Sequence, residues 1–128
     1  LPGIILTADA GVVAYRDDPF TDTLVPTKLM EYAALGMPAI AARTAAIAKY
    51  FDGTMVEFFT PGDVDDLVAC ILRLCNDQAR LAQLAAGAQE FNRRYNWKKI
   101  GAQYVALVGQ LGACRTQATK CESVRDLT

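Results

Sequence analysis

The stretch that decides the fold is PTKLMEYAALGMPAIA, residues 26–41. A helix over Thr27–Leu35 fits its spacing, because Gly36 is a typical helix stop and Pro38 prevents the helix from resuming. The apolar run Pro38–Ala42 has the length and composition of a buried strand. The stretch therefore predicts a helix followed by a strand, which is the repeating unit of an α/β fold.

The same alternation extends in both directions. Apolar runs at Gly11–Tyr15 and Thr54–Phe59 predict two more strands, and such near-continuous apolar runs are typical of parallel strands covered on both faces. Further helices are predicted over Ala45–Phe51 with Thr44 as N-cap, Val64–Cys75 with Asp63 as N-cap, from Asp77 to Phe91, and Trp97–Leu111. The predicted class is α/β: a partial Rossmann-like, three-layer domain with a short parallel sheet of about three strands and C-terminal helices.

The predicted domain covers residues 1–111, and residues 112–128 are expected to form a flexible C-terminal tail because their polar residues show no periodicity. Three strands are few for such a sheet, and the first would be an apolar edge without Lys or Pro to protect it. We therefore expect either missing upstream strands or a homodimer that covers the edge Val12–Tyr15.

Composition narrows the possible functions. The 128 residues carry a net charge of -1, which argues against nucleic acid as the partner. No apolar run approaches the roughly 20 residues of a transmembrane helix, and the N-terminus does not resemble a signal peptide. Histidine, the commonest general base and metal ligand, is absent. The four cysteines match no zinc signature and suggest structural roles in a reducing cytoplasm: Cys70, Cys75, Cys114 and Cys121.

The carboxyl ends of the strands are the expected ligand edge, because open parallel sheets bind ligands there. The loop Arg16–Val25 follows the first strand, and Arg43 follows the second. A helix beginning at Thr27 presents free N–H groups that suit a phosphate. Lys28 at that helix start is unfavourable beside the helix dipole, and a bound anion would resolve the conflict. The alternative is a solvated Lys28 paired with Glu31 at i+3.

Carboxylates near this helix have two interpretations each. Glu31 can accept hydrogen bonds from a vicinal diol such as a ribose, or it is an ordinary exposed helix residue. The aspartates Asp17, Asp18 and Asp22 suit a sugar or metal site, or they belong to turns of a solvated loop. No glycine-rich phosphate loop occurs.

Residues 9–13 together with residues 26–41 resemble the donor-binding domain of family-4 glycosyltransferases of the two-domain GT-B type. The run P-x-K-x-x-E-Y-x-A-x-G-x-P is the specific part of this resemblance. Similar residues follow at Pro61-Gly62-Asp63, Asn76-Asp77 and Tyr95-Asn96-Trp97. The resemblance covers residues 1–111.

The resemblance implies a nucleotide-sugar donor as substrate, no cofactor and no metal. The family's ribose-binding glutamate matches Glu31. Lys28 and the backbone N–H groups of Leu24 and Val25 would then face the diphosphate. These roles are implied by the family and not by the spacing of the residues.

The chain departs from the family pattern in the loop before the helix. The family's Glu-x7-Glu would place its first glutamate, the sugar contact, at Thr23. Asp18-Pro19-Phe20 resembles the family's Glu-Pro-Phe, but it lies thirteen residues before Glu31. The sugar contact therefore stays open between Asp18, Asp22 and Thr23.

The function implied is the donor-binding part of a glycosyltransferase, which we expect to be inactive without the N-terminal acceptor domain. Its catalytic residues are not identified in this chain. Two alternatives remain: a non-catalytic interaction module that self-associates through the open sheet edge, and part of a nucleotide-sugar epimerase of the same fold.

Overall fold

The computed structural model describes the backbone of residues 2–125 and the side chains of residues 3–112. The chain divides into two units, one ending at Arg94 and the other beginning at Tyr95. Each unit is described by itself.

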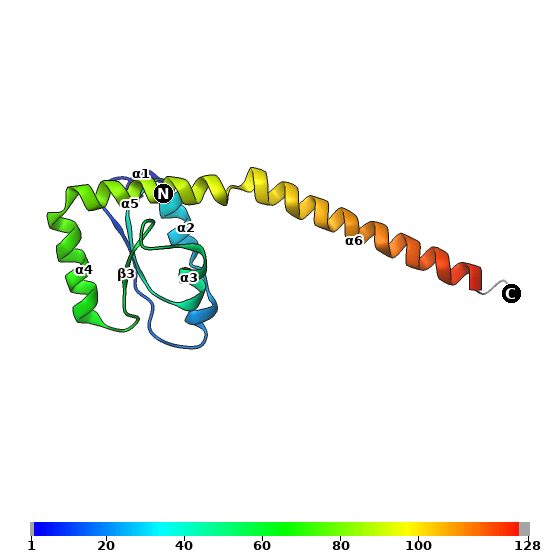
Figure 1. Cartoon of the computed structure of the whole chain (residues 1–128), viewed down its shortest axis with the longest axis horizontal. Coiled ribbons are helices and arrows are strands. Elements are labelled where there is room, and N and C mark those ends of the chain that lie inside the picture. The colour runs from blue at the N-terminus through cyan, green and yellow to red at the C-terminus, as the bar shows by residue number, and fades with distance from the viewer. Residues whose placement is uncertain (1, 126–128) are drawn as a thin grey trace. The chain divides into compact units, whose positions relative to one another are not determined.

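The first unit is built on a three-stranded parallel sheet with the order β1-β2-β3 (Figure 1). The strands are β1 (Gly11–Val13), β2 (Ala39–Ala42) and β3 (Glu57–Phe59). In the register, Val12 of β1 lies opposite Ile40 of β2. The predicted α/β class with a short parallel sheet is confirmed.

Helices surround the sheet on three sides. The helix α4 packs on β2 and β3, α2 packs on β1 and β2, and α5 crosses the amino end of the sheet (Figure 1). Their bounds are α1 (Pro2–Ile5), the 3-10 turn η1 (Thr21–Thr23), α2 (Thr27–Ala34), α3 (Ala45–Tyr50), α4 (Val64–Asn76) and α5 (Gln78–Arg94). The loops that follow β1 and β2 and the start of α2 lie at the carboxyl end of the sheet (Figure 1).

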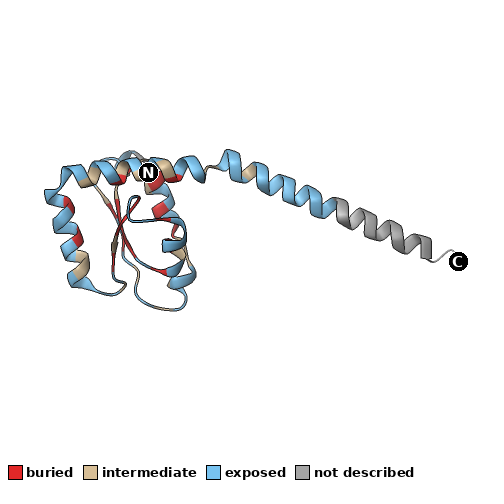
Figure 2. Ribbon diagram, viewed as in Figure 1, coloured by how far each residue is buried: buried red, intermediate tan, exposed pale blue. Residues whose placement is uncertain are grey.

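Successive side chains of each strand point to opposite faces of the sheet, and the core is therefore divided into two layers. Ala41 packs in the layer that contains α2, where the rings of Phe51 and Phe91 stack with their centroids 4.1 Å apart. Ile40 packs in the layer under α4 together with Leu74. Figure 2 shows these buried residues concentrated along the strands and the inner faces of the helices. Both layers reach α5, so this helix joins them at the amino end of the sheet.

The predicted helix stop at Gly36 and the predicted N-caps at Thr44 and Asp63 are confirmed. Gly36 adopts a positive φ of 69° after α2. The N–H of Met37 donates to the Tyr32 carbonyl and that of Gly36 to the Ala33 carbonyl, which is a Schellman motif. The hydroxyl of Thr44 caps α3 by accepting the Ile47 N–H. The Asp63 carboxylate caps α4 in the same way.

A close approach between β1 and α2 explains why Gly11 opens the first strand. A methyl group on Gly11 would lie 2.4 Å from the Tyr32 ring, which is closer than any van der Waals contact permits. The ring covers the bare backbone of β1, so the glycine and the tyrosine of the sequence motif depend on each other for packing.

All three strands are shorter than predicted, and β2 differs least, beginning at Ala39 instead of Pro38. β1 ends at Val13 instead of Tyr15, and β3 begins at Glu57 instead of Thr54. The carboxylate of Asp52 accepts the Thr54 N–H at 2.8 Å and forms a turn where the apolar residues alone suggested a strand. Extended pairing therefore begins only after this turn.

β1 is an edge strand of the described sheet, as predicted, but it is not covered on both faces. Val12 is 42% exposed, and α4 packs mainly on β2 and β3. The uncovered side chain leaves an apolar position at the sheet edge.

The described residues of the second unit form the helix α6 (Trp97–Arg125). The sequence predicts that this helix ends at Leu111, but it continues through most of residues 112–128. The added segment contains no proline, and its Ala, Arg, Gln, Lys and Glu residues favour a helix even where apolar periodicity is weak. The limits of the predicted domain and tail stay a prediction. Across residues 2–125, no helix has the length and apolar character needed to cross a membrane.

Candidate functional site

A hollow of about 340 Å³ lies at the carboxyl end of β1. Its walls are Val12–Tyr15, which continue β1 into the following loop, and Leu24–Lys28, which lead into α2. We call it the β1 hollow. The crossover from strand to helix brings these two segments together at the edge where parallel sheets bind ligands.

Backbone donors line the α2 side of the β1 hollow. Within the described part of the chain, the N–H groups of Val25, Thr27 and Lys28 have no backbone acceptor. The N–H of Leu24 is already used, because it donates to the Thr21 carbonyl at 3.2 Å. Free amides at a helix start favour an anionic ligand.

Lys28 supplies the charged group of the β1 hollow. It is exposed, and among the described residues it forms no ion pair with Glu31. The structure therefore does not contain the alternative arrangement, an ion pair between Lys28 and Glu31. Among residues 3–112, the cation of Lys28 beside the positive end of α2 has no compensating anion.

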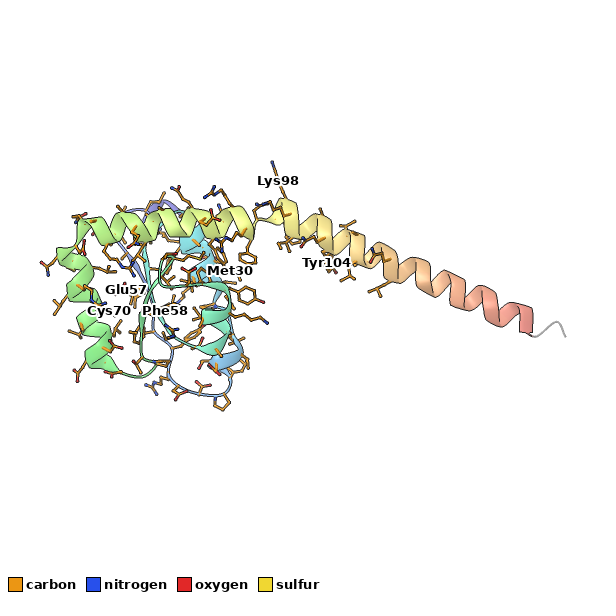
Figure 3. All side chains as sticks on the ribbon, in the orientation of Figure 1. Met30, Glu57, Phe58, Cys70, Lys98 and Tyr104 are labelled. Atoms are coloured by element: carbon orange, nitrogen blue, oxygen red, sulfur yellow. The ribbon has the colours of Figure 1, made fainter. Side chains whose placement is uncertain are left out.

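Glu31 lies one turn further along α2 and does not line the β1 hollow. It is exposed, and no hydrogen bond of its carboxylate occurs among the described residues. Its neighbour Met30, labelled in Figure 3, is also exposed. The carboxylate of Glu31 is thus available to a ligand that extends beyond the hollow.

Asp18 and Thr23 are occupied within the loop. The Asp18 carboxylate accepts the N–H groups of Phe20 at 2.9 Å and Thr21 at 3.0 Å. The hydrogen bond from the Thr21 backbone is the main cause that lowers the pKa of Asp18. The Thr23 hydroxyl donates to the Phe20 carbonyl at 2.8 Å. Both side chains shape the loop, and neither lines the β1 hollow.

Asp22 connects the loop to the next helix. Its Oδ1 atom accepts the N–H of Ala45 at the start of α3, at 2.7 Å. This contact fixes η1 against α3, and Asp22 does not line the β1 hollow either. The structure therefore brings together only Leu24, Val25 and Lys28 of the predicted site residues.

The residues that sequence reasoning missed are those of the first wall, Val12–Tyr15. Their apolar side chains predict a strand over the whole run. In the structure β1 ends at Val13, and Ala14 and Tyr15 therefore line the hollow instead of extending the strand. The rule that ligands lie beyond the strand ends was the one available signal.

Among the described residues, neither Cys70 nor Cys75 belongs to a group of potential metal ligands. Cys70 is buried, its Sγ atom donates to the Phe58 carbonyl, and burial raises the pKa of its thiol. Figure 3 places Cys70 between α4 and the sheet. Cys75 is an exposed free thiol, whereas Cys114 and Cys121 lie outside the described side chains. Residues with described side chains contain no group of three or more potential metal ligands.

Comparison with known proteins identifies the family. The family model described as "Glycosyl transferase-like" matches residues 8–106. An MMP alpha-(1->4)-mannosyltransferase from Mycolicibacterium hassiacum is 30% identical over 92 residues, which are 66% of this chain and 22% of that protein. The chain therefore belongs to the glycosyl transferase-like family.

Solved structures give the same fold. Sucrose-phosphate synthase from Thermosynechococcus elongatus superposes with a TM-score of 0.72 at 25% identity, over 84% of this chain and 26% of that one. The Anabaena protein HepE, solved in complex with UDP, superposes with a TM-score of 0.74 at 19% identity, over 86% of this chain and 30% of that one. The chain thus spans between a fifth and a third of the length of these relatives.

Proposed function

We propose that the chain is the donor-binding part of a glycosyltransferase that transfers a sugar from a nucleotide-sugar to an acceptor. The observation that carries the proposal is the β1 hollow: at this helix start the Lys28 side chain and the amides of Thr27 and Lys28 have no partner among residues 3–112. The family to which the chain belongs and the UDP bound to HepE support a nucleoside diphosphate as the ligand. The nucleotide-sugar is a substrate, and no cofactor or metal is proposed.

Positioning and charge stabilisation are the contributions that this site offers. During transfer the diphosphate leaves with growing negative charge, and preorganised donors that face this charge lower the barrier. We propose that Lys28 and the amide of Val25 supply such donors. Transfer also requires groups that bind the acceptor, so we propose that the chain alone does not catalyse the reaction and works with an acceptor-binding domain.

Glu31 is proposed to bind the ribose hydroxyls, as the resemblance to family-4 enzymes implies. Its free, exposed carboxylate one turn beyond Lys28 supports this role. For the donor sugar, Asp18, Asp22 and Thr23 remain the candidates. Their present hydrogen bonds mean that a sugar contact requires each side chain to share or exchange its internal partner.

Titration of the chain with UDP, followed by NMR of the backbone amides, tests the proposal. We expect the amides of Thr27 and Lys28 to shift, and Lys28→Gln to weaken binding about fivefold to tenfold because one charge-assisted contact is lost. Lys49→Gln is the matched control, since it removes an exposed lysine on α3 that lies outside the hollow. Equal affinities of these two variants would overturn the assignment of Lys28.

Self-association through the β1 edge is a second proposal, favoured by the exposure of Val12 on an edge strand. A homodimer would pair the segments Val12–Tyr15 of two copies by strand addition. Sedimentation velocity over a range of concentrations measures this directly, and Val12→Lys should shift the chain to monomer. A monomer at all concentrations before the substitution would refute the proposal.

We also propose a cytoplasmic location, because the exposed free thiol of Cys75 suits a reducing compartment. Fractionation of cells that express the complete protein, followed by detection of this chain, is the measurement that tests it.

A further inference from the structure

A second hollow, of about 240 Å³, opens at the carboxyl ends of β2 and β3. We call it the β3 hollow. It is lined by Arg43, the first residue after β2, by Phe58–Pro61, and by Asp66 in the first turn of α4. None of these residues lines the β1 hollow.

Arg43 is held in place without having its charge neutralised. Its guanidinium lies over the Phe58 ring, 5.2 Å from the ring centroid, and its backbone N–H donates to the Phe59 carbonyl at 2.9 Å. Among the described residues, Arg43 takes part in no ion pair. A guanidinium stacked on a ring keeps its N–H groups at the rim free to bind an oxyanion.

Asp66 faces the hollow as an acceptor. Its Oδ2 atom accepts the Thr60 N–H at 2.7 Å, and this bond is the first cause that lowers the pKa of Asp66. The carboxylate is therefore ionised at neutral pH. Since a carboxylate has about four acceptor positions, Asp66 can also accept hydrogen bonds from ligand hydroxyls.

We propose that the β3 hollow binds a small hydroxylated anion of the sugar-phosphate class. The oxyanion binds the guanidinium of Arg43, the hydroxyls donate to Asp66, and the apolar C–H groups of the sugar pack on Pro61. The volume supports a small ligand, because drug-sized ligands take roughly 300–1,000 Å³. The carboxylate of Asp66 disfavours a polyanion, which limits the ligand to one anionic group.

The two hollows share one edge of the sheet but belong to different strands. Because neighbouring strands are about 4.8 Å apart, β1 and β3 are separated by about 10 Å at this edge. The two linings share no residue, so the proposed sugar phosphate contacts other groups than a ligand in the β1 hollow does. This proposal does not depend on the identity of the ligand in the β1 hollow.

The test is an NMR titration of the chain with four probes: glucose 6-phosphate, gluconate, glucose and inorganic phosphate. We expect glucose 6-phosphate to shift the Arg43 side-chain Nε–Hε signal and the Thr60 amide. Gluconate tests whether a carboxylate can replace the phosphate group. Glucose carries the hydroxyl groups without an anionic group, and inorganic phosphate carries the anionic group without the sugar hydroxyls. Glucose and inorganic phosphate should therefore each bind at least about tenfold more weakly than glucose 6-phosphate.

Variants identify the groups that bind. Arg43→Gln should weaken glucose 6-phosphate at least about tenfold, and Asp66→Asn should reduce its advantage over inorganic phosphate. Lys49→Gln is the control, because Lys49 also lies over an aromatic ring, that of Tyr50, but outside either hollow. Its affinity should stay within about twofold of the unaltered chain.

Three results would overturn the proposal. Equal weakening by Arg43→Gln and Lys49→Gln would show a non-specific charge effect. Inorganic phosphate that binds as tightly as glucose 6-phosphate would remove the role of the hydroxyls. A Thr60 amide that responds to UDP, together with loss of glucose 6-phosphate binding in Lys28→Gln, would make the hollow part of a single donor site.

Discussion

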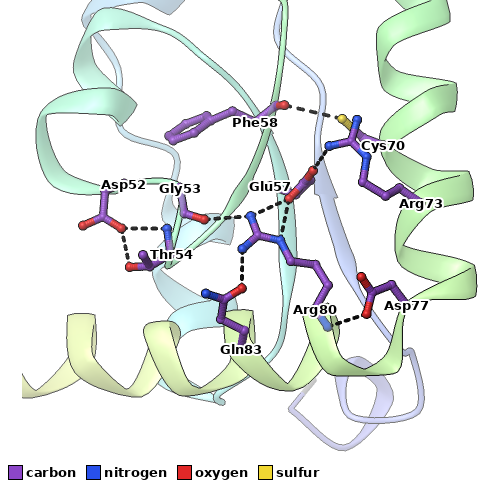
Figure 4. A network of polar contacts seen from close by, with 10 residues as sticks. All are labelled: Asp52, Gly53, Thr54, Glu57, Phe58, Cys70, Arg73, Asp77, Arg80 and Gln83. Carbon is purple, nitrogen blue, oxygen red and sulfur yellow. Dashed lines mark hydrogen bonds and ion pairs between the residues drawn. The ribbon is translucent and has the colours of Figure 1, made fainter.

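Glu57 is the buried charge whose neutralisation should cost this chain the most stability. Its side chain is 5% exposed at the start of β3 and binds two arginines, Arg73 of α4 and Arg80 of α5 (Figure 4). The Nε and Nη2 atoms of Arg80 lie 2.9 and 2.6 Å from the Glu57 carboxylate. Arg80 also donates to the Gly53 carbonyl at 2.7 Å, so the cluster joins two helices and a loop to the sheet.

The proposed perturbation is Glu57→Gln, which keeps the shape of the side chain and removes its charge. Removing one partner of a buried ion pair costs about 3–5 kcal/mol. The Arg73 side chain is 56% exposed and can return to water, whereas that of Arg80 is only 23% exposed. The expected loss of unfolding free energy is therefore at the lower end, about 3 kcal/mol. For a unit of this size that corresponds to a decrease in Tm of about 12–24 °C.

Glu90 provides a matched control within the same chain. It also binds two arginines, Arg93 and Arg94, but its side chain is 33% exposed and theirs are 78% and 56% exposed. Surface pairs contribute about 0–1 kcal/mol, so Glu90→Gln should change the unfolding free energy by no more than about 1 kcal/mol. Urea denaturation followed by circular dichroism measures both variants. Equal losses in the two variants would refute the reasoning, because burial would then not decide the cost.

Two further predictions concern packing and pH. Gly11→Ala should destabilise the chain by about 1–3 kcal/mol in urea denaturation, because its methyl group would meet the Tyr32 ring at 2.4 Å. Adding Tyr32→Ala should make the glycine substitution nearly neutral, and a fully additive double variant would contradict this contact. The pKa of Asp52 is lowered by the Thr54 hydroxyl and N–H, so its contribution to stability is complete above its ordinary pKa of 3.8 and is lost as the pH falls through the folded-state value. Unfolding free energies at pH 5 and pH 3 should therefore differ less in Asp52→Asn than in the unaltered chain, and an unchanged difference would exclude Asp52 as a cause.

The local elements could be predicted because their signals lie within a few residues. Gly36 ends α2 through its own backbone conformation, and Thr44 caps a helix that begins one residue later. The ends of the strands were predicted less accurately, because side chains outside the apolar pattern determine where each strand begins and ends. The Asp52 carboxylate, for example, forms a turn in a segment that reads as strand.

Contacts between distant residues could not be predicted from one sequence. Glu57 pairs with residues 16 and 23 positions away, and no local pattern distinguishes it from an exposed glutamate. At the site, the position of the β1 hollow followed from the topology of parallel sheets. That the carboxylate of Asp22 is engaged with the N–H of Ala45 depends on how the loop folds back on α3, which spacing does not show.

Because α5 crosses only the amino end of the sheet, substitutions that endanger the fold and substitutions that alter ligand binding fall at opposite ends of the sheet. At the amino end, Gly87 approaches the Thr54 carbonyl so closely that even a methyl group would lie 2.1 Å away, so substitution there endangers the fold. The opposite end carries Lys28 and Arg43 on exposed positions that contribute little to the core. Related chains can therefore change what they bind by altering that end while the rest stays intact, and ligand preference can diverge between relatives without a matching loss of stability.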